Sequence, residues 1–207
     1  MEERRIEDRL RAEYFELLPE MRRVLSQLEA EVRFYTLPIL HGLKDPEQLV
    51  IRSRIKDCES ALKSAVGRRK KKPSEGEGRD FDPETPEEYS LLNLEDLAGV
   101  RVLVFPQRVL SEVDGVLRTR FQGWTYKPIL DNGKVLAPKY FGTCLEASSR
   151  VCGEYQIVPM LLGLFWEVEH SAMYKFKAVA KSKEMQNSRA KVVDALAQFE
   201  KGVESFL

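Results

Sequence analysis

The feature that most limits how this chain can fold is an apolar run near its centre, residues 99–105, which reads GVRVLVF and is followed directly by Pro106. Its valines and the closing proline are typical of a buried β-strand. Helical patterns precede this run, strand and helix patterns mix around it, and helical patterns end the chain. The sequence therefore predicts an α+β fold with a mixed β-sheet of about five strands, flanked by helices and extended by helices at both termini.

The N-terminal part of the chain shows a helical repeat. Between residues 2 and 35, apolar side chains recur at spacings of three and four among charged residues, which predicts one amphipathic stripe. Pro19 lies inside this stripe and predicts two helices or a kinked one. Residues 36–45 contain two breakers and are expected to form a connection. An Asp-Pro-Glu sequence then predicts the start of a second helix, which we expect to run from residue 46 through residue 64.

The remaining segments divide into one long loop and several shorter elements. Residues 67–90 hold a basic block, glycines, prolines and acidic residues, which predicts a mobile loop. Further strands are expected at residues 124–130, 135–141 and 152–158, with a turn at 131–133, and further helices at 110–121, 161–175 and 188–207. We divide the chain into a helical segment (1–45), a central domain (46–177) and a C-terminal amphipathic helix (178–207), which must pack on the core or on another subunit.

Charge and cysteine content exclude several classes of protein. The 33 basic and 33 acidic residues cancel, so no net charge attracts the chain to nucleic acid or to an anionic membrane. The N-terminus is charged from its second residue, which argues against a signal peptide, and no apolar run approaches the roughly 20 residues that span a bilayer. The 3 cysteines form no CxxC pair and lie far from the 2 histidines, so we expect reduced thiols rather than disulfides or a zinc site. A cytoplasmic protein is expected.

The first candidate site lies on the predicted second helix. Arg54, Lys56 and Ser60 fall there, and on a helix Lys56 and Ser60 share one face. Cations and a hydroxyl along one ridge suit a polyphosphate, which needs several donors and positive charge on one side. A solvated helix face explains the same spacing.

Two carboxylates beside predicted strands form the second candidate. Asp96 precedes the central strand, from which Arg101 could contact phosphate, and Glu154 shares one face of a later strand with Gln156. A carboxylate beside a central strand can bind Mg²⁺. A helix cap or turn explains Asp96 equally well, and exposed alternation explains Glu154.

A further motif, WEVEH at residues 166–170 followed by Tyr174 and Lys175, completes a series that resembles the synthetase domain of the RelA/SpoT family, particularly the single-domain small alarmone synthetases. The family patterns are R-x-K-x-x-x-S, D-[IL]-[AIV]-G-[IV]-R, E-[IV]-Q-I-R-T and W-A-x-x-E-H-x-x-x-Y-K. They correspond here to residues 54–60, 96–101, 154–157 and 166–175. The resemblance spans about residues 50–177 and implies a nucleotidyltransferase-like synthetase fold.

The resemblance implies an alarmone-producing enzyme that transfers the β,γ-pyrophosphate of ATP to the ribose 3′-hydroxyl of an acceptor, usually GDP or GTP. It implies that Asp96 and Glu154 hold Mg²⁺, and that Glu154 acts as general base or positioning group with Gln156 beside it. The ATP-binding residues that it implies are Arg54, Lys56, Ser60, Arg68 and Arg101.

The acceptor loop departs from the family pattern P-K-x-x-G-Y-R-S-x-H. This chain has PKYFGTCLEA at residues 138–147, so Thr143 replaces the tyrosine that stacks on guanine in the family, and Ala147 replaces the histidine. Losing an aromatic platform removes about 1–3 kcal/mol of base stacking unless something replaces it. Tyr140 and Phe141 are candidate replacements, although either could equally belong to the strand core. The acceptor-binding residues that the resemblance implies are Lys139, Tyr140, Gly142, Thr143 and His170.

These departures leave the acceptor open. A guanosine nucleotide giving (p)ppGpp is the family default, and the alternatives are an adenosine nucleotide or the 3′ end of tRNA, which toxic branches of the family modify. A toxin of that kind would have an antitoxin partner. A catalytically inactive binding or regulatory module is the second hypothesis. The terminal helices permit a homo-oligomer.

Overall fold

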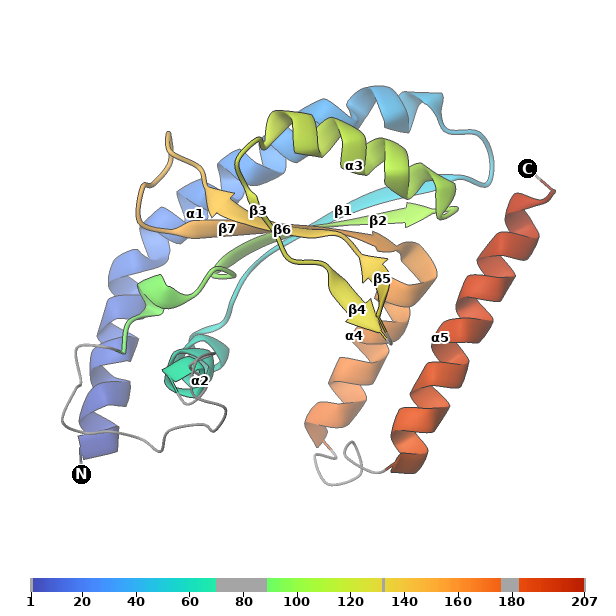
Figure 1. Ribbon diagram of the computed structural model, residues 1–207. Coiled ribbons are helices and arrows are strands. Elements are labelled where there is room, and N and C mark those ends of the chain that lie inside the picture. The colour runs from blue at the N-terminus through green and yellow to red at the C-terminus, as the bar shows by residue number, and fades with distance from the viewer. Residues whose placement is uncertain (1, 70–88, 132, 176–182, 207) are drawn as a thin grey trace.

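The computed structural model describes residues 2–69, 89–131, 133–175 and 183–206, and the fold is α+β as expected (Figure 1). The elements follow the chain in this order: α1 (Glu2–Gly42), β1 (Gln48–Ile55), α2 (Cys58–Arg69), the 3₁₀ helix η2 (Leu91–Asn93), β2 (Ala98–Phe105), α3 (Arg108–Arg120), β3 (Thr125–Tyr126), β4 (Ile129–Asp131), β5 (Lys134–Ala137), β6 (Lys139–Thr143), β7 (Cys152–Pro159), α4 (Met160–Lys175) and α5 (Lys183–Glu204). Most of the loop expected at residues 67–90 lies outside the described residues. No helix in the described ranges has both the length and the apolar character to cross a membrane.

The main sheet has five strands in the order β1-β2-β7-β6-β3, and a separate two-stranded sheet joins β4 to β5. β2 and β7 are parallel, whereas the other neighbouring pairs are antiparallel. The predicted mixed sheet of five strands is therefore confirmed. The apolar run at residues 99–105 lies in β2, which is apolar along most of its length because it lies between two neighbouring strands and under helices.

α1 continues through residues where the sequence predicts a break. Pro19 and Pro38 both lie inside one helix that ends at Gly42. Of the two expected alternatives, the division into two helices is therefore wrong, and helix replaces most of the connection expected at residues 36–45. A proline in a helix interior costs about 3 kcal/mol. α1 buries a long stripe of apolar side chains against the sheet, and this tertiary packing outweighs the local cost. The stripe consists of Leu10, Leu17, Met21, Val24, Leu28 and Val32.

β1 corrects the prediction of a helix from residue 46 through residue 64. Residues Gln48–Ile55 form a strand antiparallel to β2, and the following helix, α2, begins only at Cys58. The Asp-Pro-Glu helix signal is local, whereas pairing with β2 satisfies the backbone of the whole segment with partners far away in sequence. Pairing with β2 outweighs the local helix signal. The candidate residue Arg54 therefore lies on a strand, and Lys56 follows that strand.

The segment between α3 and β7 splits into more strands than predicted. The strand expected at residues 124–130 forms β3 and β4, and that expected at 135–141 forms β5 and β6, with Pro138 between them. Proline has no N–H to continue a ladder. β4 and β5 form the predicted hairpin, and Gly133 between them has a φ of +78°. The other expected elements are confirmed as α3, α4, α5 and β7, with α5 beginning earlier than expected.

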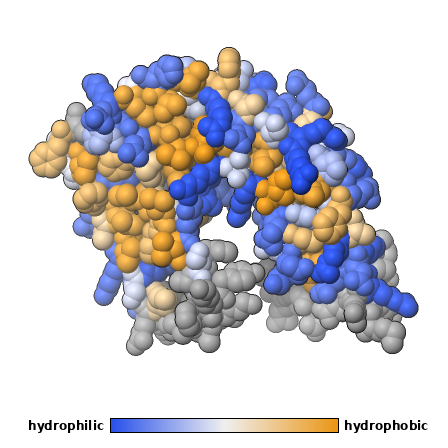
Figure 2. Space-filling view, turned by 180° about the vertical axis from the view of Figure 1, so that it is seen from behind, coloured by the Kyte–Doolittle hydropathy of each residue, from blue (hydrophilic) through white to orange (hydrophobic). Residues whose placement is uncertain are grey.

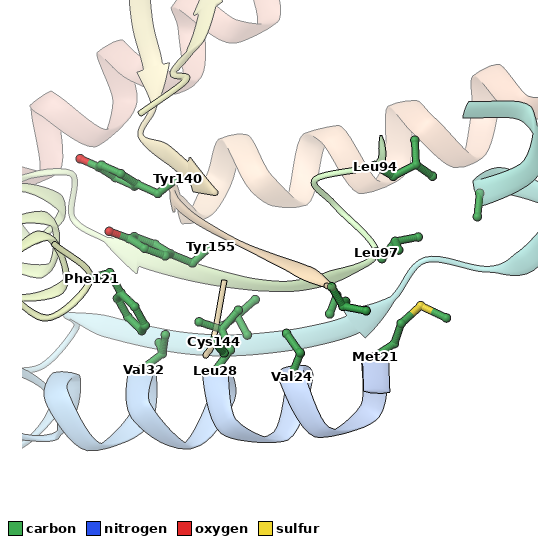
Figure 3. Close-up of a cluster of buried hydrophobic side chains, with 14 of the residues drawn as sticks. Met21, Val24, Leu28, Val32, Leu94, Leu97, Phe121, Tyr140, Cys144 and Tyr155 are labelled. Atoms are coloured by element: carbon green, nitrogen blue, oxygen red, sulfur yellow. The ribbon is translucent and has the colours of Figure 1, made fainter. Parts of the chain in front are cut away.

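Helices cover the two faces of the sheet differently (Figure 1). α1 and α3 pack on one face, where Val100, Val102 and Tyr155 belong to the main core. Figure 3 shows α1 side chains packed against this face, with the rings of Tyr140 and Tyr155 beside each other. These two rings are stacked, and their centroids are 4.7 Å apart. On the opposite face, α4 covers Leu103 at one end of the sheet through Met160 and Trp166. Away from α4, that opposite face carries the charged and polar side chains of Arg52, Arg54, Arg101, Glu154 and Gln156 together with Phe141.

Candidate active site

Two rows of side chains cross the sheet on the face opposite α1. In the first row, Arg52 of β1 lies beside Arg101 of β2, Arg101 lies beside Gln156 of β7, and Gln156 lies beside Lys139 of β6. Side chains alternate between the two faces along a strand, so these four point away from the core that α1 covers. Four strands that are far apart in sequence thus bring cations and an amide into one line.

The second row consists of Arg54, Gly99, Glu154 and Phe141, again one residue from each of the four strands. Gly99 brings no side chain to the row. A Cβ at that position would lie 3.9 Å from Glu154 Oε1. This is an ordinary van der Waals distance, so a methyl group would fit there, and the glycine only adds room beside the Glu154 carboxylate.

The two rows contribute to a cavity of about 250 Å³. Figure 2 shows a hollow in the lower half of the molecule, with hydrophilic side chains at its upper edge. The residues that line the cavity are Arg52, Ser53, Arg54, Gly99, Val100, Arg101, Glu154, Gln156 and Glu167. Three arginines outnumber two carboxylates in this lining, and none of these residues is aromatic. Such a lining suits a polyanion such as a chain of phosphates.

Glu154 is the buried carboxylate of the cavity. Its side chain accepts a hydrogen bond from Gln156 Nε2 and lies 3.6 Å from Lys139 Nζ, and the residue is only 5% exposed. Burial raises the pKa of Glu154; Lys139 lowers it, and nearby Asp96 raises it, with a net increase over the ordinary carboxyl value. A carboxylate with a raised pKa is a stronger base, so this environment suits a proton acceptor.

Asp96 lies between η2 and β2 and is paired with Lys56, which follows β1. Lys56 Nζ donates to Asp96 Oδ2 at 2.6 Å, and the two side chains are only 13% and 19% exposed. The backbone N–H of Lys56 also donates to the carbonyl of Leu97 at 2.9 Å, which fixes Lys56 beside the start of β2. Because Asp96 raises the pKa of Glu154, the two predicted metal ligands lie within electrostatic reach of one another.

This pair of carboxylates fits a divalent cation. Like charges that approach in a partly buried site repel, and a cation held by both removes the repulsion. Within the described residues, no group of three or more His, Cys, Asp and Glu side chains is arranged to hold a metal ion. Two carboxylates are nevertheless enough for Mg²⁺, which usually keeps several waters and takes further ligands from substrate phosphates.

Arg52 and Arg101 share a carboxylate partner that comes from α4. Arg52 Nη1 donates to Glu167 Oε1 at 2.6 Å and also contacts Oε2, and Arg101 Nη1 lies 3.8 Å from Glu167 Oε1. Burial lowers the pKa of the Arg101 guanidinium, and the positive charge of Arg54 lowers it further. The arginines are therefore crowded enough to affect one another, and an anion between them is favoured.

The predicted ATP-binding residues do not form the single helical ridge expected from the sequence. Arg54 belongs to β1 and lines the cavity, whereas Lys56 follows the strand and holds Asp96. Ser60 and Arg68 lie in α2. The backbone N–H of Ser60 donates to Asp57 Oδ1 at 2.9 Å. Asp57 therefore caps the N-terminus of α2, and Ser60 supplies the capped N–H.

The predicted acceptor-binding residues lie on both faces of the sheet. Lys139 is on the Glu154 face, whereas Tyr140 alternates to the α1 face and is 5% exposed. Gly142 is also on the α1 side, where a Cβ would lie 2.5 Å from carbons of the Trp124 ring. The structure therefore makes Tyr140 part of the core, and it makes Gly142 the residue that admits Trp124. Thr143 lines a separate pocket beside α1, and His170 lies in α4.

Phe141 is on the same face as Glu154 but does not offer an open ring. It is 6% exposed, and Lys127 Nζ and Lys139 Nζ lie 5.2 Å and 4.7 Å from its ring centroid. Ammonium groups at this distance from an aromatic ring are attracted by its π electrons. Phe141 therefore contacts two lysines, of which Lys139 lies beside Glu154, rather than presenting a platform for a base.

Sequence reasoning missed two charged residues of the cavity, Arg52 and Glu167. The alternation of arginine at positions 52 and 54 places both side chains on one face of a strand, so this signal is readable once the segment is assigned as β1. Glu167 has no such local signal, because the packing of α4 on the sheet decides which of its side chains reaches the cavity.

The chain has the fold of solved small alarmone synthetases. Small alarmone synthetase 1 from Bacillus subtilis bound to its product pppGpp superposes with a TM-score of 0.65 at 18% identity, over 93% of this chain and 95% of that chain. The same synthetase bound to AMPCPP gives a TM-score of 0.63 at 17% identity, over 93% and 94% of the two chains. The expected synthetase fold is confirmed.

A GTP pyrophosphokinase family protein from Streptococcus pneumoniae shares the fold with a TM-score of 0.57 at 19% identity, over 91% of this chain and 89% of that chain. Neither protein-family models nor curated proteins give a match to this sequence. The likeness is therefore one of fold, carried by element order and sheet topology.

Proposed function

We propose that this protein is a pyrophosphokinase that transfers the β,γ-pyrophosphate of ATP to the ribose 3′-hydroxyl of a nucleotide acceptor. The observation that carries the proposal is the place of Glu154, a buried carboxylate between an arginine-lined cavity and Lys139. The protein has the fold of synthetases whose structures hold AMPCPP or pppGpp, which supports a donor triphosphate and a nucleotide acceptor here.

The chemistry requires alignment and charge neutralisation more than covalent catalysis by the protein. The 3′ oxygen of the acceptor forms a bond to the β-phosphorus of ATP, the bond from that phosphorus to the oxygen bridging to the α-phosphorus breaks, and AMP leaves with the electron pair. In this proposal Arg52, Arg54 and Arg101 hold donor phosphates. Glu154 takes the proton of the 3′-hydroxyl, while Gln156 and Lys139 hold its carboxylate in place.

Asp96 and Glu154 would hold Mg²⁺, which supplies positive charge to the transferred group when it is bound. Without a cation, Lys56 and Lys139 neutralise the same two carboxylates. These lysines hold the two side chains in position before the nucleotide arrives.

The acceptor in this proposal is a guanosine nucleotide, with adenosine nucleotides and the 3′ end of tRNA as the alternatives that experiment must separate. Tyr140 is packed in the core, and the ring of Phe141 is covered by two lysines. Neither therefore replaces the missing tyrosine as a stacking surface, and selection among bases should be weak.

The test is an assay with Mg²⁺, labelled ATP and each of GDP, GTP, AMP, ADP, ATP and tRNA. We expect transfer of label to at least one acceptor, and loss of transfer when EDTA removes the cation. Asp96→Asn and Glu154→Gln should each abolish transfer without a loss of thermal stability. Absence of transfer to every acceptor, while a known synthetase works in the same buffer, would overturn the enzyme proposal. ATP binding without transfer would identify a binding or regulatory module instead.

The cellular setting is also a proposal: a cytoplasmic protein that self-associates through its terminal helices and, if it is toxic, is restrained by an antitoxin. Large apolar side chains exposed on these helices support self-association, among them Phe15 and Phe34 on α1 and Phe199 on α5. Light scattering during gel filtration tests it, and a monomer at every concentration would contradict it.

A further inference from the structure

α4 brings one carboxylate, Glu167, into the arginine-lined cavity. Glu167 bonds to Arg52 through both carboxylate oxygens and lies 3.8 Å from Arg101 Nη1. The geometry of a carboxylate held by arginines is the one that a phosphate group would adopt with the same side chains. In the protein without ligand, Glu167 therefore occupies part of the anion-binding surface.

The position of Glu167 follows from how closely α4 approaches β2. Gly163, one helical turn before Glu167, lies against Leu103: a Cβ at Gly163 would be 2.5 Å from Leu103 Cδ2. Residues four apart share a face of a helix, so the face that Gly163 presses onto the sheet is the one that carries Glu167. Leu103 and Arg101 lie on the same face of β2, and Glu167 reaches Arg101 for that reason.

The Glu167 pair is held loosely enough to be exchanged. The side chains of Arg52 and Glu167 are 47% and 39% exposed, so water can solvate both groups when the pair opens. A partly exposed ion pair of this kind adds little stability of its own. A phosphate chain carries more negative charge than one carboxylate and can contact Arg52, Arg54 and Arg101 together.

We infer that Glu167 is a resident counter-ion of the cavity: it neutralises Arg52 and Arg101 when no ligand is bound, and the phosphates of the donor nucleotide displace it. Glu167 thus sets donor affinity, lowering it below what the arginines alone would give. The inference rests on the proposed function for the identity of the donor nucleotide. What it states physically is that the Glu167 carboxylate and a polyphosphate compete for the same guanidinium groups.

Glu167→Gln tests this inference, because it removes the charge and keeps the shape. Glu169→Gln is the matched control: Glu169 lies on the same helix and pairs with Arg189 of α5 at 2.8 Å, outside the cavity. Calorimetry with inorganic pyrophosphate and with Mg²⁺-ATP should show about fivefold tighter binding to Glu167→Gln, the scale of one partly exposed ion pair. The control should bind as the wild type does.

A second readout uses stability. Without ligand, Glu167→Gln leaves the crowded arginines without their partner, so its melting temperature should fall by about 2 °C, and added pyrophosphate should raise it more than it raises that of the wild type. Equal or weaker binding of both anions by Glu167→Gln, with the wild type binding normally, would overturn this inference and leave the proposed function intact. Failure of both proteins to bind either anion would overturn the inference and the proposed function together.

Discussion

At the scale of single residues, Glu154 is in a surrounding that favours its protonated form. Burial is the main reason that its pKa is raised. Between the ordinary carboxyl pKa and this raised value, the folded protein binds more protons at this residue than the unfolded chain does. Stability contributed by this proton is fully present below the ordinary pKa and is lost as pH rises through the folded pKa.

Glu154→Gln should therefore lose transfer activity by at least about 100-fold, the scale of a removed general base, and yet gain stability with rising pH relative to the wild type. Thermal melts in EDTA across this pH window measure the second effect. Glu146→Gln, an exposed glutamate beside α1, is the control and should show neither change. A fall in the stability of Glu154→Gln relative to the wild type as pH rises would show that the Glu154 pKa is lowered, contrary to our assignment.

At the scale of elements, β6 shows how one strand serves two purposes. Lys139 and Phe141 lie on the Glu154 face of the sheet, while Tyr140 and Gly142 lie on the face that α1 and α3 cover. The resemblance to the synthetases assigns Gly142 to acceptor binding, but its contact with Trp124 gives this glycine a packing reason that is independent of any ligand.

Gly142→Ala should destabilise the protein by about 1–3 kcal/mol, because the new methyl group overlaps the rigid indole ring. Gly115→Ala is the contrasting variant: Gly115 lies inside α3, where a methyl group added to it would have no neighbouring atom within 4 Å. Alanine in that helix interior should stabilise by about 0.5–1 kcal/mol. Urea unfolding measures the free energy of unfolding of each variant, which should fall for Gly142→Ala and rise for Gly115→Ala. Two variants of equal stability would contradict the packing that we describe for Trp124.

At the scale of the whole molecule, the C-terminal helix α5 packs against the rest of the protein, and one acidic side chain of α5, Glu200, is buried there. Glu200 is 2% exposed and borders a cavity lined by side chains from β5, α4 and α5. Burial raises the pKa of Glu200 to about 7, and the nearby charge of Glu204 contributes to the increase. The folded state therefore gains stability from protonated Glu200 at acidic pH and loses it as pH rises through about 7.

Glu200→Gln should match the wild type in stability near the ordinary carboxyl pKa and exceed it above pH 7, by up to about 3 kcal/mol. Denaturant unfolding at a series of pH values gives this difference, and Asp194→Asn on the exposed side of the same helix serves as control. A constant difference between Glu200→Gln and the wild type across the series would mean that Glu200 does not titrate with the folding of the molecule.

Local patterns in the sequence are enough to predict the elements whose signals lie in neighbouring residues. The valine-rich run defined β2, the apolar stripes defined α1, α3 and α5, and motif order pointed to the synthetase fold. Asp96 and Glu154 were also singled out in this way. Two local signals failed where contacts between distant segments competed with them. The Asp-Pro-Glu start predicted a helix in the segment that pairs with β2, and the breakers of residues 36–45 predicted a connection where α1 continues to Gly42.

Contacts between distant segments decide which candidate residues lie together in the cavity. Only the folded chain shows these contacts. Parallel pairing of β2 with β7 sets Gly99 beside Glu154, antiparallel pairing with β1 adds Arg54, and helix packing adds Glu167. Alternation along β6 then separates Lys139 from Tyr140. The physical reason is that the period of a strand or helix is written in neighbouring residues, whereas register and facing depend on contacts between segments that are far apart in the chain.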